Sequence, residues 1–122
     1  KLDIDSYDFK KVDENITQFQ QISRQIKGSV IVKGKYDLIL SGTKFKINKS
    51  GNPGMTVGGT GDALSGIATA LFAQGLNAFD SACLAVFING LAGDMAFAEK
   101  GNGFSARDFV SFIGDVIKNG LC

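Results

Sequence analysis

The sequence predicts an α/β fold in which a short meander of strands is followed by three helices. Two patterns support this prediction. Residues 30–49 contain a β-branched run and an alternating segment, whereas residues 62–119 carry apolar side chains at helical spacing. The chain has 122 residues, of which 44% are hydrophobic and 20% charged. It therefore has enough core material for one ordinary domain, or for part of a larger one.

An amphipathic helix is expected ahead of the strands, from about Glu14 to Lys27, with Gly28 ending it. Its apolar residues recur at helical spacing: Ile16, Phe19, Ile22 and Ile26.

The meander is expected to contain three strands. Residues 30–32 (VIV) form a β-branched run that is typical of a strand buried on both faces. Residues 37–40 (DLIL) predict a second strand, which a turn at residues 41–43 connects to the third. Residues 44–48 (KFKIN) alternate, with lysine on one side, and this predicts a half-exposed antiparallel strand.

Three helices are expected to follow. The first runs from Asp62 to Gln74 and stops at Gly75, and the second runs from about Asp80 to Glu99. Ser105 precedes the third, and Asp108 three residues later resembles a capping box. This helix closes at residue 120 and carries one apolar stripe: Phe109, Phe112, Ile113 and Val116.

The first two of these helices carry few charges, since Asp80 and Asp94 are the only charged residues between Ala63 and Ala98. Polar and glycine residues interrupt the apolar run at positions 89, 90, 93 and 94, which favours a buried helix over a membrane span. Helices that are apolar nearly all round must be covered on more than one side. We therefore expect either homo-oligomers or packing against a part of the domain that lies outside this chain.

Composition excludes several classes of function. The chain contains no histidine, which removes Ser-His-Asp and Cys-His catalysis and most zinc sites from it. The net charge of +1 gives no global attraction for nucleic acid or an acidic membrane, so neither is expected as a partner. Cys83 and Cys122 have no paired spacing, and we therefore expect a reducing, cytoplasmic location.

The most informative segment is a glycine-rich loop, residues 50–62, with the sequence SGNPGMTVGGTGD. Five glycines between positions 51 and 61 lead directly into an apolar helix, and a helix start offers unpaired N–H donors to an anion, most often phosphate. A glycine-rich turn that merely packs tightly is the alternative. No Gly-Lys-Ser/Thr closes the loop, and the third glycine of a dinucleotide fingerprint is missing, so neither of those phosphate motifs is present.

Asp62 is the candidate catalytic residue of this loop. A carboxylate at a helix start often serves only as a cap. Here it stands beside three glycines in a loop suited to an anion, where it could orient a hydroxyl and accept its proton while a phosphoryl group is attacked. The amides of Thr60 and Gly61 would stabilise charge on the transferred group.

The meander adds a second candidate feature, an excess of positive charge. Asp37 is its only acidic residue between positions 33 and 49, against five lysines: Lys33, Lys35, Lys44, Lys46 and Lys49. Lysines on an exposed strand are commonly there for solubility alone. Lys33 differs because it ends the strand expected to be buried, where residues that contact ligands tend to lie in α/β sheets.

Two adjacent motifs carry a family resemblance. GNPGM at residues 51–55, followed by GGTGDALSG at 58–66, resembles the NAD(P)H-hydrate dehydratase family, nucleotide-dependent repair enzymes of the ribokinase-like superfamily. Further agreement lies in VKG at 32–34, AQGL at 73–76 and NGLAGD at 89–94. The similarity runs from about residue 26 to residue 117. Thr56-Val57 departs from the family's usual Ala-Thr, which removes or shifts one hydroxyl.

The resemblance implies a three-layer ribokinase-like fold, of which residues 1–122 would form the C-terminal portion of one nucleotide-binding domain. The N-terminal half of such a domain, with a histidine-containing substrate loop, has no counterpart in this sequence. The isolated chain is therefore expected to be inactive unless the other half is supplied.

The resemblance also implies a reaction and a set of site residues. ADP or ATP with Mg²⁺ would drive dehydration of the S epimer of hydrated NADH or NADPH, through phosphorylation of the ring hydroxyl and loss of phosphate. Asp62 would be catalytic and would face the hydrated ring, with Asn52 also binding substrate. No protein ligand to a metal is implied. The nucleotide would contact Lys33, Gly34, Lys35, Tyr36, Asp37, Gly59, Thr60 and Gly61.

Two other functions remain open at this point. A ribokinase-like kinase of a sugar or vitamin would keep the roles of Gly61 and Asp62 and change only the acceptor. A non-catalytic nucleotide-binding half-domain would keep the loop without turnover.

Overall fold

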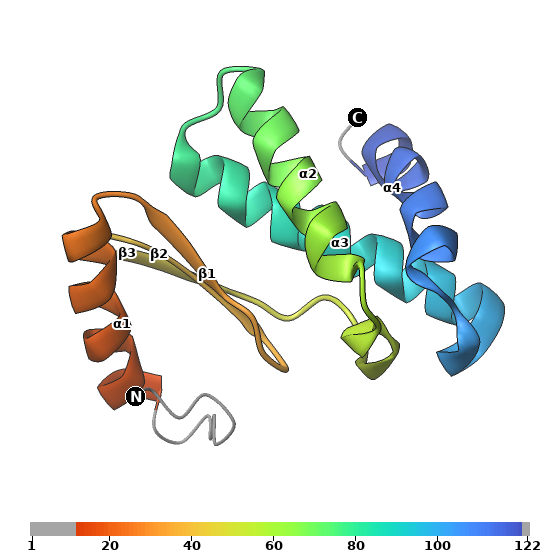
Figure 1. Ribbon diagram of the computed structural model, residues 1–122, viewed down its shortest axis with the longest axis horizontal. Helices are drawn as coiled ribbons and strands as arrows, with labels where there is room; N and C mark the ends of the chain where they lie inside the picture. Colours follow the sequence, from red (N-terminus) through yellow and green to blue (C-terminus); the bar gives the residue numbers. More distant parts are fainter. Residues whose placement is uncertain (1–11, 121–122) are drawn as a thin grey trace.

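The computed structural model describes residues 12–120, in which a three-stranded sheet lies between one helix on one face and two on the other (Figure 1). The elements follow in the order α1 (Val12–Ile26), β1 (Ser29–Val32), β2 (Asp37–Ser41), β3 (Lys44–Asn48), the 3₁₀ turn η3 (Pro53–Thr56), α2 (Thr60–Ala73), α3 (Ala78–Lys100), the 3₁₀ turn η4 (Gly101–Gly103) and α4 (Ala106–Gly120). The predicted meander followed by three helices is confirmed in this part of the chain.

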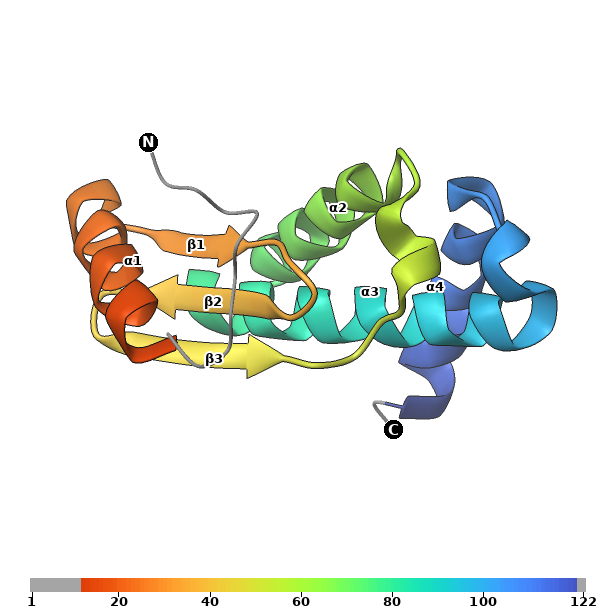
Figure 2. The ribbon, with the colours of Figure 1, turned by 90° about the horizontal axis from the view of Figure 1, so that it is seen from below.

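The sheet is antiparallel, in the order β1-β2-β3, with Ile31 opposite Ile39 and Ile39 opposite Lys46 (Figure 2). One expectation about burial is wrong. Residues 30–32 of β1 were expected to be buried on both faces but are only half-buried, because within the described residues β1 forms one edge of the sheet. The central strand β2 takes the buried position instead, with four buried residues in succession. On the other edge strand, β3, Phe45 is 46% exposed.

Alternate residues of β2 serve two different layers. Leu38 and Leu40 face α1, where they pack with Ile16 and Phe19 in one buried cluster. Ile39 belongs to a second cluster on the other side of the sheet, with residues of α2 and α3: Leu64, Ala82, Ala85 and Val86. Because side chains of a strand alternate between faces, this short strand joins three layers.

The helix α3 is the centre of the molecule. By length and composition the stretch from Ala78 to Gly103 is apolar enough to cross a membrane, but 56% of its apolar 18-residue window is buried within this structure. The sheet and α2 cover one side of it, and α4 covers the other through a cluster around Ile88, Phe104 and Phe109. Ten residues of α3 are buried. This is the buried helix that the sequence predicts.

The helix ends follow the signals in the sequence to within two residues, and α1, α2 and α3 each begin two residues before the predicted start. α2 begins at Thr60, two residues before the predicted start, because Gly59 ahead of it adopts a left-handed conformation (φ 98°) that a glycine tolerates. Gly75 (φ 100°) ends it as predicted. The predicted capping box is confirmed, since the Ser105 N–H donates to the Asp108 carboxylate at 2.9 Å and the Asp108 N–H donates to the Ser105 hydroxyl at 3.3 Å.

Cover over the helices is incomplete, as expected from their composition. Large apolar side chains of all three remain exposed, with Phe72 of α2 the most exposed at 59%. The others on α3 and α4 are Phe87, Met95, Phe97, Val110 and Ile117.

The start of α4 gives a test by pH. The hydrogen bond from Lys100, followed by the bonds from Ser105, holds the pKa of Asp108 well below its usual range. Its contribution to stability is therefore fully present above the unfolded pKa of about 3.9 and is lost as pH falls further toward the folded pKa. We expect Asp108→Asn to lower the melting temperature at pH 7, and the gap to wild type to close as pH falls from about 5 to about 2.

Thermal denaturation followed by circular dichroism measures this gap, with Asp115→Asn, an exposed position on the same helix, as the matched control. A gap that stays constant across the pH range would contradict the assignment.

Candidate functional site

A cavity of about 670 Å³ lies between the β1–β2 turn and the loop that leads out of β3. The turn contributes residues 33–37, the loop contributes residues 49–53 with Met55 and Thr56, and α3 contributes Gly90. This volume is in the range of small-molecule and cofactor sites. Two segments that are separate in the sequence thus form the walls of one pocket.

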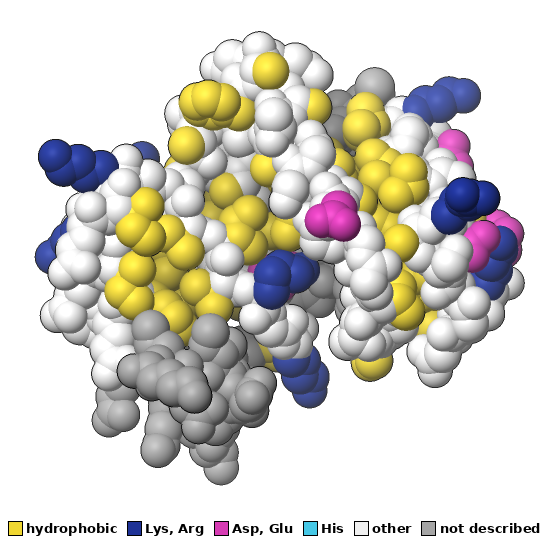
Figure 3. Space-filling view, in the orientation of Figure 1, with side chains coloured by type: hydrophobic (Ala, Val, Ile, Leu, Met, Phe, Trp, Pro, Cys, Tyr) yellow, Lys and Arg dark blue, Asp and Glu magenta, His cyan; other side chains and the backbone are white. Residues whose placement is uncertain are grey.

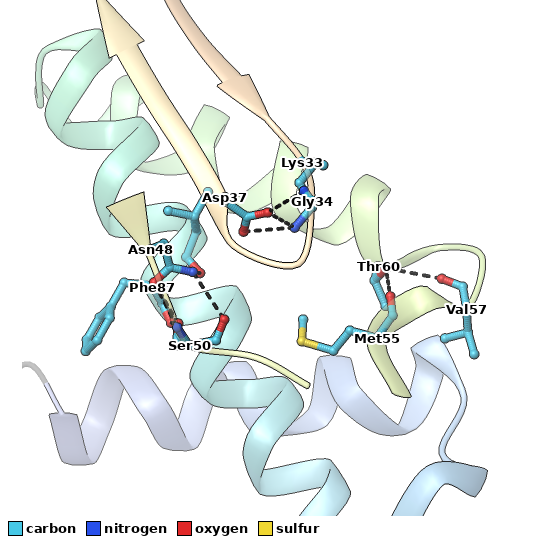
Figure 4. A network of polar contacts seen from close by, with 10 residues as sticks. Lys33, Gly34, Asp37, Asn48, Ser50, Met55, Val57, Thr60 and Phe87 are labelled. Atoms are coloured by element: carbon cyan, nitrogen blue, oxygen red, sulfur yellow. Dashed lines mark hydrogen bonds and ion pairs between the residues drawn. The ribbon is translucent and has the colours of Figure 1, made fainter. Parts of the chain in front are cut away.

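The β1–β2 turn is folded around the carboxylate of Asp37, whose side chain is only 8% exposed (Figure 4). The Lys33 ammonium lies 3.0 Å from both carboxylate oxygens, and the Gly34 N–H donates to one of them at 3.4 Å. A buried carboxylate requires such partners. Asp37 therefore organises the turn, while the half-exposed side chain of Lys33 still borders the cavity.

The charges around the cavity favour an anionic ligand. Lys33, Lys35 and Lys49 line it, against the single carboxylate of Asp37. The Lys35 ammonium lies 5.7 Å from the centre of the Tyr36 ring, within cation–π distance. A pocket lined mainly by one sign of charge concentrates ligands of the opposite sign.

The loop that forms the second wall is anchored at its start to α3. The Ser50 hydroxyl donates to the Asn48 side-chain oxygen at 2.8 Å, and the buried Asn48 amide donates to the Val86 carbonyl of α3 at 3.3 Å (Figure 4). Asn48, the last residue of β3, thereby fixes where the loop leaves the sheet.

Asn52 closes the next turn of this loop. Its side-chain oxygen accepts from the Gly54 N–H at 3.1 Å and its amide donates to the Asp94 carboxylate at 2.9 Å. Gly54 is buried against the Phe104 ring, where an added Cβ would come within 2.7 Å of the ring. The Thr56 hydroxyl turns back to donate to the Pro53 carbonyl at 2.9 Å. The loop therefore holds its shape through its own polar groups and α3.

The start of α2 combines open backbone donors with an unengaged acid. The first helical bond runs from the Ala63 N–H to the Gly59 carbonyl at 3.1 Å, so the N–H groups of Thr60, Gly61 and Asp62 have no intrahelical partner. The space beside Gly61 is open. The Asp62 side chain is exposed and makes no hydrogen bond or ion pair with any residue between 12 and 120.

The hydroxyl of Thr60 ties this helix start to the pocket wall. Its single hydrogen is shared between the Met55 carbonyl at 2.9 Å and the Val57 carbonyl at 3.1 Å, and the residue is 8% exposed (Figure 4). Thr60 therefore has its hydroxyl engaged within the protein, and its backbone amide is the group that remains for a ligand.

The structure groups the predicted site residues in two places. The turn residues 33–37 and Asn52 line one cavity, whereas residues 59–62 lie at the neighbouring helix start, outside the lining. Figure 3 shows basic side chains at the β1–β2 turn and an acidic side chain on α2 on the same face of the molecule. The two groups meet through the Met55–Thr60 bond.

Two residues of this region were not singled out from the sequence as site residues. Lys49 lines the cavity but stood out only as part of the excess of lysine. Asp94 bonds to the loop from outside the lining and stood out only as a charge in the apolar helices and as part of a matching motif. A signal was present in the spacing of Gly90, Gly93 and Asp94, which places all three on one face of a helix. In the described part of the chain, no group of three or more His, Cys, Asp or Glu residues could hold a metal ion.

The fold defines a ribokinase-like protein. The structure of ADP/ATP-dependent NAD(P)H-hydrate dehydratase from Bacillus subtilis, co-crystallised with ATP and Mg²⁺, superposes with a TM-score of 0.76 at 18% identity, covering 89% of this chain and 40% of that one. A ribokinase-like superfamily protein from Enterococcus faecalis superposes with the same score at 25% identity, covering 84% and 36%. The predicted fold class is thereby confirmed.

The chain belongs to the NAD(P)H-hydrate dehydratase family, whose sequence model matches residues 3–114. The bifunctional NAD(P)H-hydrate repair enzyme Nnr of Methanothermobacter thermautotrophicus is 50% identical over 113 residues, which are 93% of this chain and 22% of that protein. The ADP-dependent (S)-NAD(P)H-hydrate dehydratase of Cenarchaeum symbiosum is 35% identical over 107 residues, 88% of this chain and 37% of that protein. The chain thus spans well under half of these relatives.

The buried hydroxyl of Thr60 can be tested directly. Thr60→Val keeps the shape of the side chain but leaves two carbonyls without their donor, so we expect the free energy of unfolding to fall by about 1–3 kcal/mol. Thr60→Ser should retain most of the stability. Urea denaturation measures the change, with Thr69→Val as the matched control because the exposed Thr69 hydroxyl bonds only within its own helix. Equal losses at positions 60 and 69 would contradict the tie between α2 and the loop.

Proposed function

We propose that this chain carries the nucleotide site and the catalytic acid–base group of an ADP/ATP-dependent NAD(P)H-hydrate dehydratase. The reaction is the return of (S)-hydrated NADH or NADPH to the intact cofactor. The observation that carries the proposal is the exposed Asp62 carboxylate, unengaged by the residues described, at a helix start whose amides are open and which adjoins a basic cavity. The names of the relatives support the choice of substrate.

In this proposal ADP or ATP occupies the cavity and its phosphates approach α2. The fit rests on the volume of about 670 Å³, the three lysines of the lining and the open space beside Gly61. Lys33, Gly34, Lys35, Tyr36 and Asp37 form the wall along the nucleoside monophosphate. The amides of Gly59, Thr60 and Gly61 hold the transferred phosphate, as helix starts commonly do.

Asp62 accepts the proton of the substrate hydroxyl while the oxygen of that hydroxyl attacks the terminal phosphoryl group of the nucleotide. The nucleotide supplies that phosphoryl group, which converts hydroxide, a poor leaving group, into phosphate, a good one. The bond from phosphorus to the nucleotide's bridging oxygen breaks in the first step. In the second, the bond from the ring carbon to the phosphate oxygen breaks and phosphate leaves with the electron pair. The adjacent ring carbon gives up one proton to water, and its electron pair forms the ring double bond again.

Mg²⁺ would enter with the nucleotide rather than through a protein cage. The described residues gather no carboxylate cluster for it, and Mg²⁺ is commonly held by substrate phosphates, water and one or two carboxylates. Its contribution would be to neutralise phosphate charge, while the lysines of the cavity orient the nucleotide.

We further propose that residues 1–122 form the C-terminal portion of one ribokinase-like domain in a cytoplasmic protein. The coverage of 36–42% of the solved ribokinase-like chains supports the assignment to a portion of a domain. The exposed Phe72, Phe87 and Phe97 would then pack against the remainder of the domain or, in the alternative, against a second copy of the chain. The partner in catalysis is a small molecule, not nucleic acid or a membrane.

The test uses a fusion protein in which this chain follows the N-terminal portion of the Cenarchaeum symbiosum dehydratase. With ATP, Mg²⁺ and hydrated NADH, we expect a steady return of the near-ultraviolet absorbance of NADH, whereas the 122 residues alone should give none. Asp62→Asn should lower kcat about 10²–10⁴-fold with little change in nucleotide affinity. Asp115→Asn, which also removes an exposed carboxylate, should leave the rate unchanged.

Other outcomes point to other functions. Accumulation of a stable phosphorylated product without elimination would favour a small-molecule kinase. Nucleotide binding with no turnover in any mixture would indicate a non-catalytic module. A rate unaffected by Asp62→Asn would overturn the catalytic assignment.

A further inference from the structure

Asp94, on α3, makes two hydrogen bonds to the loop that lines the cavity. One carboxylate oxygen accepts from the Gly51 N–H at 3.0 Å and the other accepts from the Asn52 side-chain amide at 2.9 Å. Asp94 is partly buried, and neither ion pair formed within residues 12–120 involves it. Bonds in which the acceptor is ionised are about twice as strong as neutral ones, so this carboxylate is a strong anchor for its two neutral donors.

The surface of α3 is shaped to bring the loop to this carboxylate. Gly90, Gly93 and Asp94 share one helix face; Ser50 of the loop lies on Gly90 and the Met55 side chain lies on Gly93. A Cβ on Gly90 would overlap Ser50, and a Cβ on Gly93 would overlap Met55. The absence of these two side chains lets the loop approach closely enough for Asp94 to reach it.

Both polar groups of the Asn52 side chain are engaged within the protein. Its oxygen accepts from the Gly54 N–H while its amide donates to Asp94. Asp94, Asn52 and Gly54 thus form a continuous chain of bonds from the helix into the loop. An Asn engaged in this way supports the pocket wall, which differs from the direct contact with substrate that the family resemblance implies for it.

Asp94 itself does not line the cavity, whereas Gly51, Asn52 and Met55 do. Met55 in turn accepts the bond from Thr60, at the start of the helix that carries Asp62. A shift of the loop would therefore move both the pocket wall and the support of the catalytic helix start.

We propose that Asp94 is a positioning residue, which holds the pocket-lining loop 51–56 through Asn52, and that Asn52 acts as part of this support. The effect on turnover rests on the function proposed above, whereas the effect on the loop does not.

An exchange of the two side chains tests the pair. Asp94→Asn leaves two amide side chains facing each other at positions 52 and 94, and Asn52→Asp leaves two carboxylates facing each other there. Neither single variant can form the three bonds of the wild type. In the double variant Asn52→Asp/Asp94→Asn, the carboxylate at 52 can accept from the Gly54 N–H and from the amide at 94, whose oxygen can accept from the Gly51 N–H. All three bonds are thereby restored: the bond between positions 52 and 94 runs in the opposite direction, while the Gly51 and Gly54 N–H groups donate as before.

The first measurement is amide hydrogen exchange at Gly51 and Gly54 in the 122-residue chain, by nuclear magnetic resonance. We expect each single variant to speed exchange at Gly51 about tenfold or more, and the double variant to return it to within about threefold of wild type. Asp115→Asn is the matched control and should change neither amide. The proposal would be overturned if the Gly51 amide exchanged at the wild-type rate in both single variants. It would also be overturned if the Gly51 exchange rate did not recover in the double variant.

The second measurement is kcat and KM in the fusion protein, at a temperature at which every variant is folded. The single variants should lose about tenfold in kcat/KM and the double variant should recover most of it. A loss that follows only the melting temperature, with normal kcat/KM in the folded variants, would reduce Asp94 to a structural role and overturn the proposal. An inactive wild-type fusion would count against the dehydratase function, while the exchange rates would still decide the question of the loop.

Discussion

Contact between the glycine-bearing face of α3 and one loop, made through Ser50 and Met55, determines where the cavity lies. Gly90 and Gly93 of α3 leave room that Ser50 and Met55 occupy. A side chain at Gly90 would overlap the backbone of Ser50 and push the loop outward, because protein interiors are closely packed. A side chain at Gly93 would instead force the Met55 side chain to move. The wall of the cavity, the two bonds of the Asn52 side chain and the bond from Thr60 to the Met55 carbonyl all involve this loop. They therefore depend on its close approach to α3.

The same helix links the sheet to the site. α3 packs against β2 with its N-terminal half and against α4 with its C-terminal half, and the loop crosses it between these two contacts (Figure 2). Residues of β3 are tied to it as well, through the bond from Asn48 to the Val86 carbonyl. The lysine-bearing turn and the start of α2 therefore share one rigid support, although they are far apart in the sequence.

Much of this could be predicted from the sequence, because local signals decided it. Gly75 and the Ser105–Asp108 pair set helix ends through their own backbone bonds, and the alternation in KFKIN was enough to place β3. The burial of β1 was not predictable, since a run such as VIV has the same composition at the edge of a sheet as at its centre. Asp94 was not recognised as a partner of Asn52 because 42 residues separate them and only the folded helix brings them together.

The turn around Asp37 has a thermodynamic consequence for the nucleotide binding proposed above. Its carboxylate already receives bonds from Lys33 and Gly34 in the free protein. A turn that is ordered before the ligand arrives loses little conformational entropy on association, so more of the gross attraction appears as affinity. Neutralising part of the lysine charge in advance also keeps the turn from being driven open by mutual repulsion. Asp37, the one carboxylate among the lysines that line this cavity, therefore preorganises the β1–β2 turn.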